Sequence, residues 1–261
     1  AMLADAAVIE VSSAALIADR VHEMQFAGAV LTGLGTDHLD LHETPESYRA
    51  AKRRLFEMLP ADAFAVIPGD DPLAKSFAEA AKCPVATFGE SKTCDWRVRD
   101  HKPGISSATF VLEGPNFSET IEINRPASWD ARNLASAVAA AVAMGAAPEY
   151  AARGAASCPP IPGRWEIVDA GQPFAAVVDY AHTPEALERA LGQLRSTIEG
   201  RAVLVFGCGG ERDRDKRELM GEVAAKHADA VFVTDDNPRG EDPEEIARPL
   251  VEALRSAGTE H

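Results

Sequence analysis

The stretch from residue 205 to residue 241 constrains the fold of this chain most. Its sequence, VFGCGGERDRDKRELMGEVAAKHADAVFVTDDNPRGE, predicts a strand, a glycine turn, a helix, a second strand and a polar turn. Ligand sites of parallel sheets lie beyond the carboxyl ends of the strands. We therefore expect the glycine turn with Arg212 and the turn Asp236-Asn237-Pro238-Arg239 to lie side by side, at a site for a small, charged molecule that carries a carboxylate.

The same alternation of strands and helices extends through the C-terminal part of the chain and predicts a small α/β unit. Strands are expected at 175–179, 203–207 and 231–234, each followed by a helix. The segment 154–164, GAASCPPIPGR, is rich in Gly and Pro and is typical of a linker. We therefore expect one domain over residues 1–154 and a second over residues 155–261.

The first half also reads as alternating strands and helices, which predicts a parallel sheet. Two runs of alternating residues around Gly114-Pro115-Asn116 predict a hairpin over 108–124, and an alanine-rich helix is expected at about 130–146. Before the hairpin, strands are expected at 8–11, 29–32 and 64–67, with helices at about 14–22 and 45–59.

Composition excludes several classes of protein. The chain has 261 residues, of which 46% are hydrophobic, so it can bury a sizeable core in one or two domains. It contains no run of eighteen apolar residues and no secretory signal pattern, which favours the cytoplasm and argues against membrane insertion. Its four cysteines match neither a CxxC metal pair nor a disulfide framework. A net charge of -15 argues against a nucleic-acid partner.

Acidic residues and a histidine are expected at one edge of the first sheet. Glu10 lies in the first predicted strand, Asp37-His38 follow the second, and Asp70-Asp71 follow the third. Such an oxygen-rich edge suits Mg²⁺. Acidic residues after strands are also common helix caps, and spacing alone leaves both interpretations open.

Several motifs together resemble the Mur ligases, which build the peptide of bacterial peptidoglycan, and the resemblance covers nearly all of the chain. It implies an α/β protein in which an incomplete Mur-ligase central ATPase domain is followed by a smaller, Rossmann-like C-terminal domain. The motifs are Glu10-Val11-Ser12-Ser13, Asp37-His38-Leu39-Asp40, Tyr48-Arg49-Ala50-Ala51-Lys52, the stretch DYAHTPEAL from Asp179, and Asp236-Asn237-Pro238-Arg239.

The resemblance implies a magnesium site and a modified lysine in the central domain. In the Mur ligases the glutamate of the first motif and the histidine of the second hold Mg²⁺, so Glu10 and His38 are the implied ligands. The family carries a carbamylated lysine at the position of Lys52, where the carbamate orients Mg²⁺ beside ATP. Without the resemblance, Lys52 is an ordinary surface lysine.

The resemblance also implies the substrate contacts. Asn133, Arg164, Asp179 and His182 match residues that line ATP between the two domains, and His182 joins Lys52 as a catalytic residue. The UDP-N-acetylmuramoyl-dipeptide is expected near Ser12 and Arg20.

The polar turn after the last strand predicts the amino-acid substrate. The Asp-Asn-Pro-Arg sequence is typical of the diaminopimelate-adding Mur ligases, and a guanidinium at Arg239 suits the distal carboxylate of meso-diaminopimelate. Arg212, Asp236 and Asn237 are further implied contacts. The alternative is a turn-capping Asn-Pro with a solvated arginine.

The chain departs from the family pattern in four places. It contains no G-x-x-x-x-G-K-[ST] loop, the main phosphate cradle, and no final GKGHE-type turn. We therefore expect that the chain begins inside the central domain, ends before the family's C-terminal end and is inactive by itself. Ala14 stands where the family usually has His, and Gly33 where it usually has Asn.

Two classes of function follow. The first is an ATP-dependent amide-bond ligase that adds meso-diaminopimelate to UDP-N-acetylmuramoyl-L-alanyl-D-glutamate (UDP-MurNAc-L-Ala-D-Glu) through an acyl phosphate. The second is a non-catalytic binding module with Mur-ligase architecture. Folylpolyglutamate synthase is a related ligase with the same architecture, but the turn at Arg239 argues against it.

Overall fold

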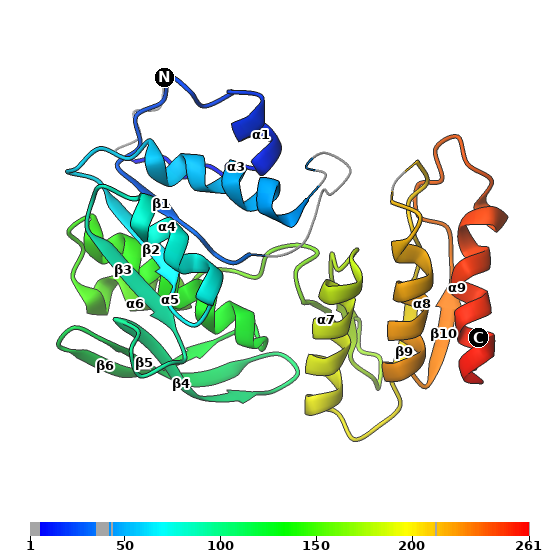
Figure 1. Ribbon diagram of the computed structural model, residues 1–261. Helices are drawn as coiled ribbons and strands as arrows, with labels where there is room; N and C mark the ends of the chain where they lie inside the picture. The colour runs from blue at the N-terminus through cyan, green and yellow to red at the C-terminus, as the bar shows by residue number, and fades with distance from the viewer. Residues whose placement is uncertain (1–5, 35–41, 43, 212, 261) are drawn as a thin grey trace, which may run out of the picture. The chain divides into compact units, whose positions relative to one another are not determined.

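The computed structural model of the protein describes residues 6–34, 42, 44–211 and 213–260. The chain divides into two compact units (Figure 1). The first unit comprises Ala1–His101, Phe110–Ile121 and Trp129–Cys158, and the second comprises Lys102–Thr109, Glu122–Ser128 and Pro159–His261.

A six-stranded sheet with the strand order β1-β2-β3-β4-β5-β6 forms the centre of the first part of the chain. The first four strands are parallel neighbours, as the alternation of strands and helices predicts. β5 and β6 form the expected hairpin, with Asn116 at a φ of 57° in the turn. The strands are β1 (Gly28–Val30), β2 (Phe64–Pro68), β3 (Val85–Gly89), β4 (Trp96–Pro103), β5 (Ala108–Gly114) and β6 (Phe117–Ile123).

Helices precede, connect and follow these strands along the chain. α3 begins after Thr44, whose side chain accepts from the Ser47 backbone N–H in a capping box. The sequence did not predict α6, which begins at Pro148 and overlaps the start of the expected linker. The elements are α1 (Ser13–Ile17), α3 (Pro45–Glu57), η1 (Pro72–Ala74), α4 (Lys75–Ala80), α5 (Ser128–Ala143) and α6 (Pro148–Ala156).

The main core of the first unit lies between α3, α4 and the parallel strands. Phe56 of α3 and Phe77 of α4 meet edge to face, with ring centroids 5.4 Å apart, over Ala65 and Ile67 of β2. Both rings are fully buried. Burying one such side chain stabilises the fold by roughly 1.5 to 3 kcal/mol, so these contacts hold the helices firmly on the sheet.

The strand predicted over residues 8–11 is wrong. This segment is neither helix nor strand, Val8 is 99% exposed and Ile9 is 46% exposed. A strand is stabilised by backbone hydrogen bonds to a neighbour, and β1 pairs instead with β2. The segment leads directly to Ser12, which caps α1.

The described residues of the second unit that follow Pro159 form two small sheets and three helices. Its core joins Leu187 and Leu191 of α7, Met220 of α8 and Leu250 of α9. α8 connects the parallel strands β9 and β10, which confirms the predicted β-α-β unit. β8, in contrast, pairs antiparallel with β7. The elements are β7 (Glu166–Val168), β8 (Ala176–Val178), α7 (Pro184–Thr197), β9 (Val203–Phe206), α8 (Lys216–His227), β10 (Ala230–Val233) and α9 (Pro243–Ala257).

Within the described part of the chain, no helix is both long enough and apolar enough to span a bilayer.

Candidate functional site

The glycine turn after β9 and the polar turn after β10 lie against each other, as the sequence predicts. A Cβ atom on Gly207 would stand 2.0 Å from the carbonyl oxygen of Thr234, and one on Gly210 would stand 1.9 Å from that of Pro238. Both distances are far below van der Waals contact, so the two backbones approach where only glycine fits. The Gly210 N–H donates to the carbonyl of Asn237 at 3.2 Å, which joins the turns directly.

The polar turn has an unusual backbone. Asn237 has a φ of 45° and Arg239 a φ of 53°, and Glu211 in the facing turn has a φ of 53°. The left-handed region is common for glycine and tolerated by Asn, but it is uncommon for Arg and Glu. Such conformations persist only where surrounding contacts hold them, and they concentrate at functional sites.

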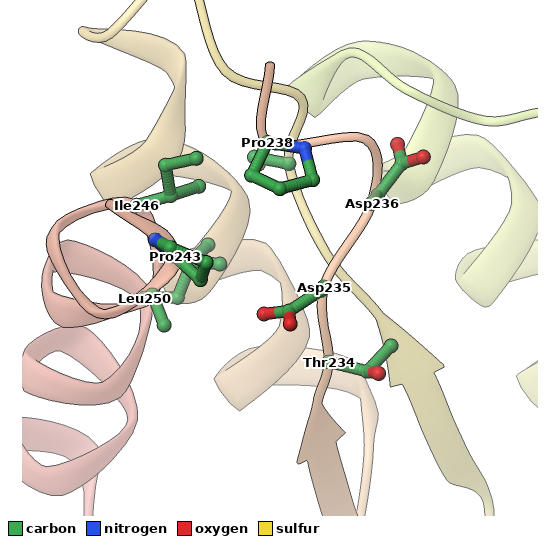
Figure 2. A pocket seen from close by; sticks show the side chains of 9 residues that line it. Thr234, Asp235, Asp236, Pro238, Pro243, Ile246 and Leu250 are labelled. Atoms are coloured by element: carbon green, nitrogen blue, oxygen red, sulfur yellow. The ribbon is translucent and has the colours of Figure 1, made fainter. Parts of the chain in front are cut away.

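A narrow pocket opens beside this turn, between β10 and the start of α9 (Figure 2). The carboxylate of Asp235 points toward Pro243 and Leu250, whereas that of Asp236 points to the opposite side of the chain. One wall is therefore apolar, and the Asp235 carboxylate faces it. The lining residues are Cys208, Thr234, Asp235, Asp236, Pro238, Pro243, Ile246, Ala247 and Leu250.

The structure brings three of the four implied diaminopimelate contacts together. Asp236, Asn237 and Arg239 are all exposed in the polar turn, and Nη1 of Arg239 donates to the carbonyl of Gly210. Arg212 lies outside the described residues. The exposed side chains form a charged rim where the sequence predicts one.

Sequence reasoning missed an ion pair beneath this rim. Two guanidinium nitrogens of Arg217 lie 3.0 and 3.1 Å from the two carboxylate oxygens of Glu241, and Arg214 adds a contact at 3.3 Å. Hydrogen bonds from Arg217, and then from the Glu211 backbone N–H, lower the pKa of Glu241 to about 2. The signals that could have found this pair are the basic run after the glycine turn and an acidic residue two positions after Arg239.

Three of the four implied ATP contacts gather around Tyr180 in the second unit. The Arg164 guanidinium lies 4.5 Å from the centroid of the Tyr180 ring, and the ring of His182 lies 4.8 Å from it, edge to face. Asp179 accepts from the backbone N–H groups of Trp165 at 2.8 Å and Ala181 at 2.9 Å. The motif therefore folds into a tight polar cluster with an exposed aromatic ring.

The fourth implied ATP contact, Asn133, is exposed on α5 of the first unit. Its neighbour Arg132 lies 3.1 Å from Asp70, which also accepts from the backbone N–H of Ser91 at 2.8 Å. Burial would raise the pKa of Asp70, but these donors and the Arg132 charge outweigh burial and lower it. Asp70 thus ties α5 to the loop after β3.

Asp71 has a different structural role, because it accepts from the Leu73 N–H at 2.9 Å and caps η1. The helix-cap interpretation is therefore the better one for this residue.

Burial and the nearby Asp70 raise the pKa of the Cys94 thiol to about 11, so this cysteine is a poor thiolate ligand.

The predicted magnesium ligands are only partly described. Glu10 is exposed and belongs to no strand, which corrects the expectation that it lies in the first strand of the sheet. The side chain of Lys52, on α3, lies over the Tyr48 ring, with Nζ 5.0 Å from the ring centroid. His38 lies outside the described residues. Among the residues that the structure describes, no three His, Cys, Asp or Glu side chains are grouped to hold a metal ion.

The implied dipeptide contacts lie at the two ends of α1. The hydroxyl of Ser12 accepts from the Ala15 N–H at 3.2 Å and caps the helix, and Arg20 is exposed just beyond it. The next residue, Ser13, is buried and lies 2.9 Å from Nε2 of the buried His42.

Family models match both parts of the chain. The model of the Mur ligase middle domain matches residues 2–141, and that of the Mur ligase, glutamate ligase domain, matches residues 163–260. The two units, the paired turns and these matches define one class of protein. The chain belongs to the Mur ligase family.

Two curated relatives that the chain matches belong to one branch of this family. The chain is 41% identical over 253 residues to the UDP-N-acetylmuramoyl-L-alanyl-D-glutamate--2,6-diaminopimelate ligase of Syntrophomonas wolfei subsp. wolfei, covering 96% of the chain and 52% of the relative. It is 42% identical over 255 residues to the ligase of the same name from Chlorobaculum tepidum, covering 92% of the chain and 50% of the relative. The chain thus spans about half the length of these curated relatives.

Solved structures show the same relationship. A structure of a UDP-N-acetylmuramoyl-L-alanyl-D-glutamate--2,6-diaminopimelate ligase has a TM-score of 0.66 and 34% identity, and the match covers 92% of this chain and 50% of that one. A MurF ligase from Thermotoga maritima in complex with ADP has a TM-score of 0.70 at 22% identity, covering 90% and 58%. The second likeness concerns the fold alone.

Proposed function

We propose that this chain supplies most of the central domain and most of the amino-acid-binding domain of a ligase that adds meso-diaminopimelate to UDP-MurNAc-L-Ala-D-Glu. In this reaction ATP phosphorylates the γ-carboxylate of the D-glutamyl residue. The amine of diaminopimelate then attacks the acyl phosphate, and ADP and phosphate leave. The cytoplasm, which holds ATP, is the proposed compartment.

The paired turns of the second unit carry this proposal. Arg239 and Asn237 project from a backbone that close contacts hold in the left-handed region. A guanidinium donates five N–H groups, and the contact to Gly210 uses one nitrogen, so the group retains donors for a carboxylate. Diaminopimelate differs from lysine by one distal carboxylate, which is the group that such an arginine recognises.

The cluster around Tyr180 supports ATP as the phosphate donor. Arg164 and His182 lie against one exposed aromatic ring, and Asp179 is fixed by two backbone N–H groups. A guanidinium and an imidazole can stabilise charge on a phosphoryl group. We propose His182 as a catalytic residue, with Arg164, Asp179 and Asn133 as nucleotide contacts.

Mg²⁺ is the proposed metal. A carboxylate at Glu10, an imidazole at His38 and a carbamate on Lys52 make an oxygen-rich donor set that suits Mg²⁺. Bound Mg²⁺ supplies neutralising charge to the phosphates. In this structure Nζ of Lys52 lies 5.0 Å from the centroid of the Tyr48 ring, so Lys52 must leave that ring to reach a metal as a carbamate.

The alternative is a binding module without catalysis. The observation that favours it lies within the chain, where Ala14 and Gly33 stand at positions at which the family usually has His and Asn. A module would bind the amino acid or nucleotide without turnover even when the remaining parts of a ligase are supplied.

A chimaera distinguishes the ligase from the non-catalytic binding module. In the Syntrophomonas wolfei relative, the 253 aligned residues are replaced by this chain, and ADP release is measured with UDP-MurNAc-L-Ala-D-Glu, Mg²⁺ and either meso-diaminopimelate or lysine. The proposal predicts turnover with diaminopimelate. A folded chimaera that is inactive, or that uses lysine equally well, would contradict it.

Arg239→Ala sharpens the test. A charge-assisted contact is worth roughly 1.5 to 3 kcal/mol, so kcat/KM for diaminopimelate should fall by about ten- to a hundred-fold, with little effect on lysine. Arg248→Ala is the matched control, because Arg248 is an exposed arginine on α9 paired with Glu245. An unchanged ratio of the two kcat/KM values would show that Arg239 is only a solvated turn residue.

A further inference from the structure

We infer that Arg217 and Glu241 act as a pair of positioning residues that hold Arg239 and Asn237 in the geometry needed to bind the amino acid. This inference rests on the proposed function, since it gives the turn a substrate. It concerns residues that do not themselves reach the exposed rim.

The pair joins both turns at once. Arg217 binds Glu241 through two nitrogens, and its Nη2 also donates to the carbonyl of Gly209 at 3.4 Å. Glu241 accepts in addition from the backbone N–H of Glu211. The Arg217 guanidinium therefore contacts the glycine turn at Gly209 and also Glu241, which lies two residues after the polar turn. The Glu241 carboxylate contacts the glycine turn as well, at the Glu211 N–H.

The pair is shielded from solvent. The Arg217 side chain is 4% exposed and that of Glu241 is 11% exposed. Ion pairs on an open surface contribute little, whereas removal of one partner of a buried pair leaves the other charge without compensation. Arg214 differs, since it reaches Glu241 from the rim with a side chain that is 73% exposed.

The position of the pair in the chain links it to specificity. Only Gly240 separates Glu241 from Arg239, so the carboxylate anchors the turn within two residues of the substrate-facing guanidinium. Arg239 and Glu211 both have φ values of 53°, a conformation that neighbouring contacts must maintain. Releasing the anchor frees these residues to relax and moves the guanidinium away from the substrate carboxylate.

Amide exchange in the 261-residue chain tests the anchor itself. In Glu241→Gln we expect exchange at the Gly210 and Glu211 amides to accelerate by about tenfold or more, because the variant keeps the side-chain shape and loses the charge. Glu245→Gln is the matched control, since Glu245 forms an exposed pair with Arg248. Unchanged exchange in Glu241→Gln would overturn the inference.

Binding to the same chain tests the link to specificity. NMR titration with meso-diaminopimelate and with L-lysine should show weaker diaminopimelate binding in Glu241→Gln by about tenfold or more, with lysine binding unchanged. Arg217→Lys keeps the charge but cannot form the bidentate contact, so its affinity for diaminopimelate should lie between those of the wild type and Glu241→Gln.

The two measurements separate the possible failures. Faster exchange with unchanged diaminopimelate binding would overturn the positioning role and leave a structural pair. If the wild-type chain shows no preference for diaminopimelate over lysine, the proposed amino-acid specificity fails, and the positioning role that depends on it fails too. The exchange experiment still decides whether the pair holds the two turns together.

Discussion

Replacing Gly210 by alanine should destabilise the second unit strongly, because the new methyl group has no room. The added Cβ would stand 1.9 Å from the carbonyl oxygen of Pro238 and 2.7 Å from its carbonyl carbon. The obstructing atoms belong to the backbone, so no side-chain rotation can relieve the overlap. The polar turn must move away from the glycine turn instead.

The size of the effect follows from the overlap. Inserting a methyl group into packed space costs typically 1 to 3 kcal/mol, and an immobile backbone neighbour places this substitution near the upper end, at about 3 kcal/mol. With a denaturant slope of about 2 kcal/mol/M, the urea midpoint of the second unit should fall by roughly 1.5 M.

Urea unfolding followed by circular dichroism, with hydrogen exchange in α8 to report on the second unit, measures this change. Gly192→Ala is the matched control, because Gly192 lies within α7 and an added Cβ meets nothing within 4 Å. Alanine there should stabilise the unit by about 0.5 to 1 kcal/mol. If Gly210→Ala were as stable as wild type, the contact between the two turns would be refuted.

Three further predictions concern catalysis and pH. The 261-residue chain alone should not release ADP at about 1 s⁻¹ or faster, because it lacks the phosphate-binding loop; such turnover would contradict this. In the active chimaera, Lys52→Ala should abolish activity, and a short-chain carboxylic acid should restore part of it by replacing the carbamate charge; full activity of the variant would exclude the carbamate. The pKa of Glu241 is lowered from 4.5 to about 2, so its contribution to stability is present above about pH 4.5 and is lost as the pH falls toward 2. The difference in urea midpoint between wild type and Glu241→Gln should therefore be constant from pH 7 to 5 and shrink below pH 4.5; a difference that does not change with pH would show that the Glu241 charge does not contribute.

Local patterns predicted most of the fold because the forces that produce its elements act over short stretches of chain. Alternating apolar runs indicated β5 and β6, and the helix expected at about 45–59 is α3. The run over residues 8–11 shows the limit of such patterns. It has the composition of a strand, but a strand also requires a hydrogen-bonding neighbour, which is a property of the folded molecule.

The sequence by itself determined the parallel β-α-β unit of the second part of the chain and the polar turn that follows it, since glycine, proline and apolar spacing act locally. Only the tertiary structure decided how that turn is held. Gly210 must be glycine because the carbonyl of Pro238 occupies the space that a Cβ atom would need, and Arg217 pairs with Glu241 although 24 positions separate them. Close backbone approach and buried charge pairing depend on distances in space, which residue order does not contain.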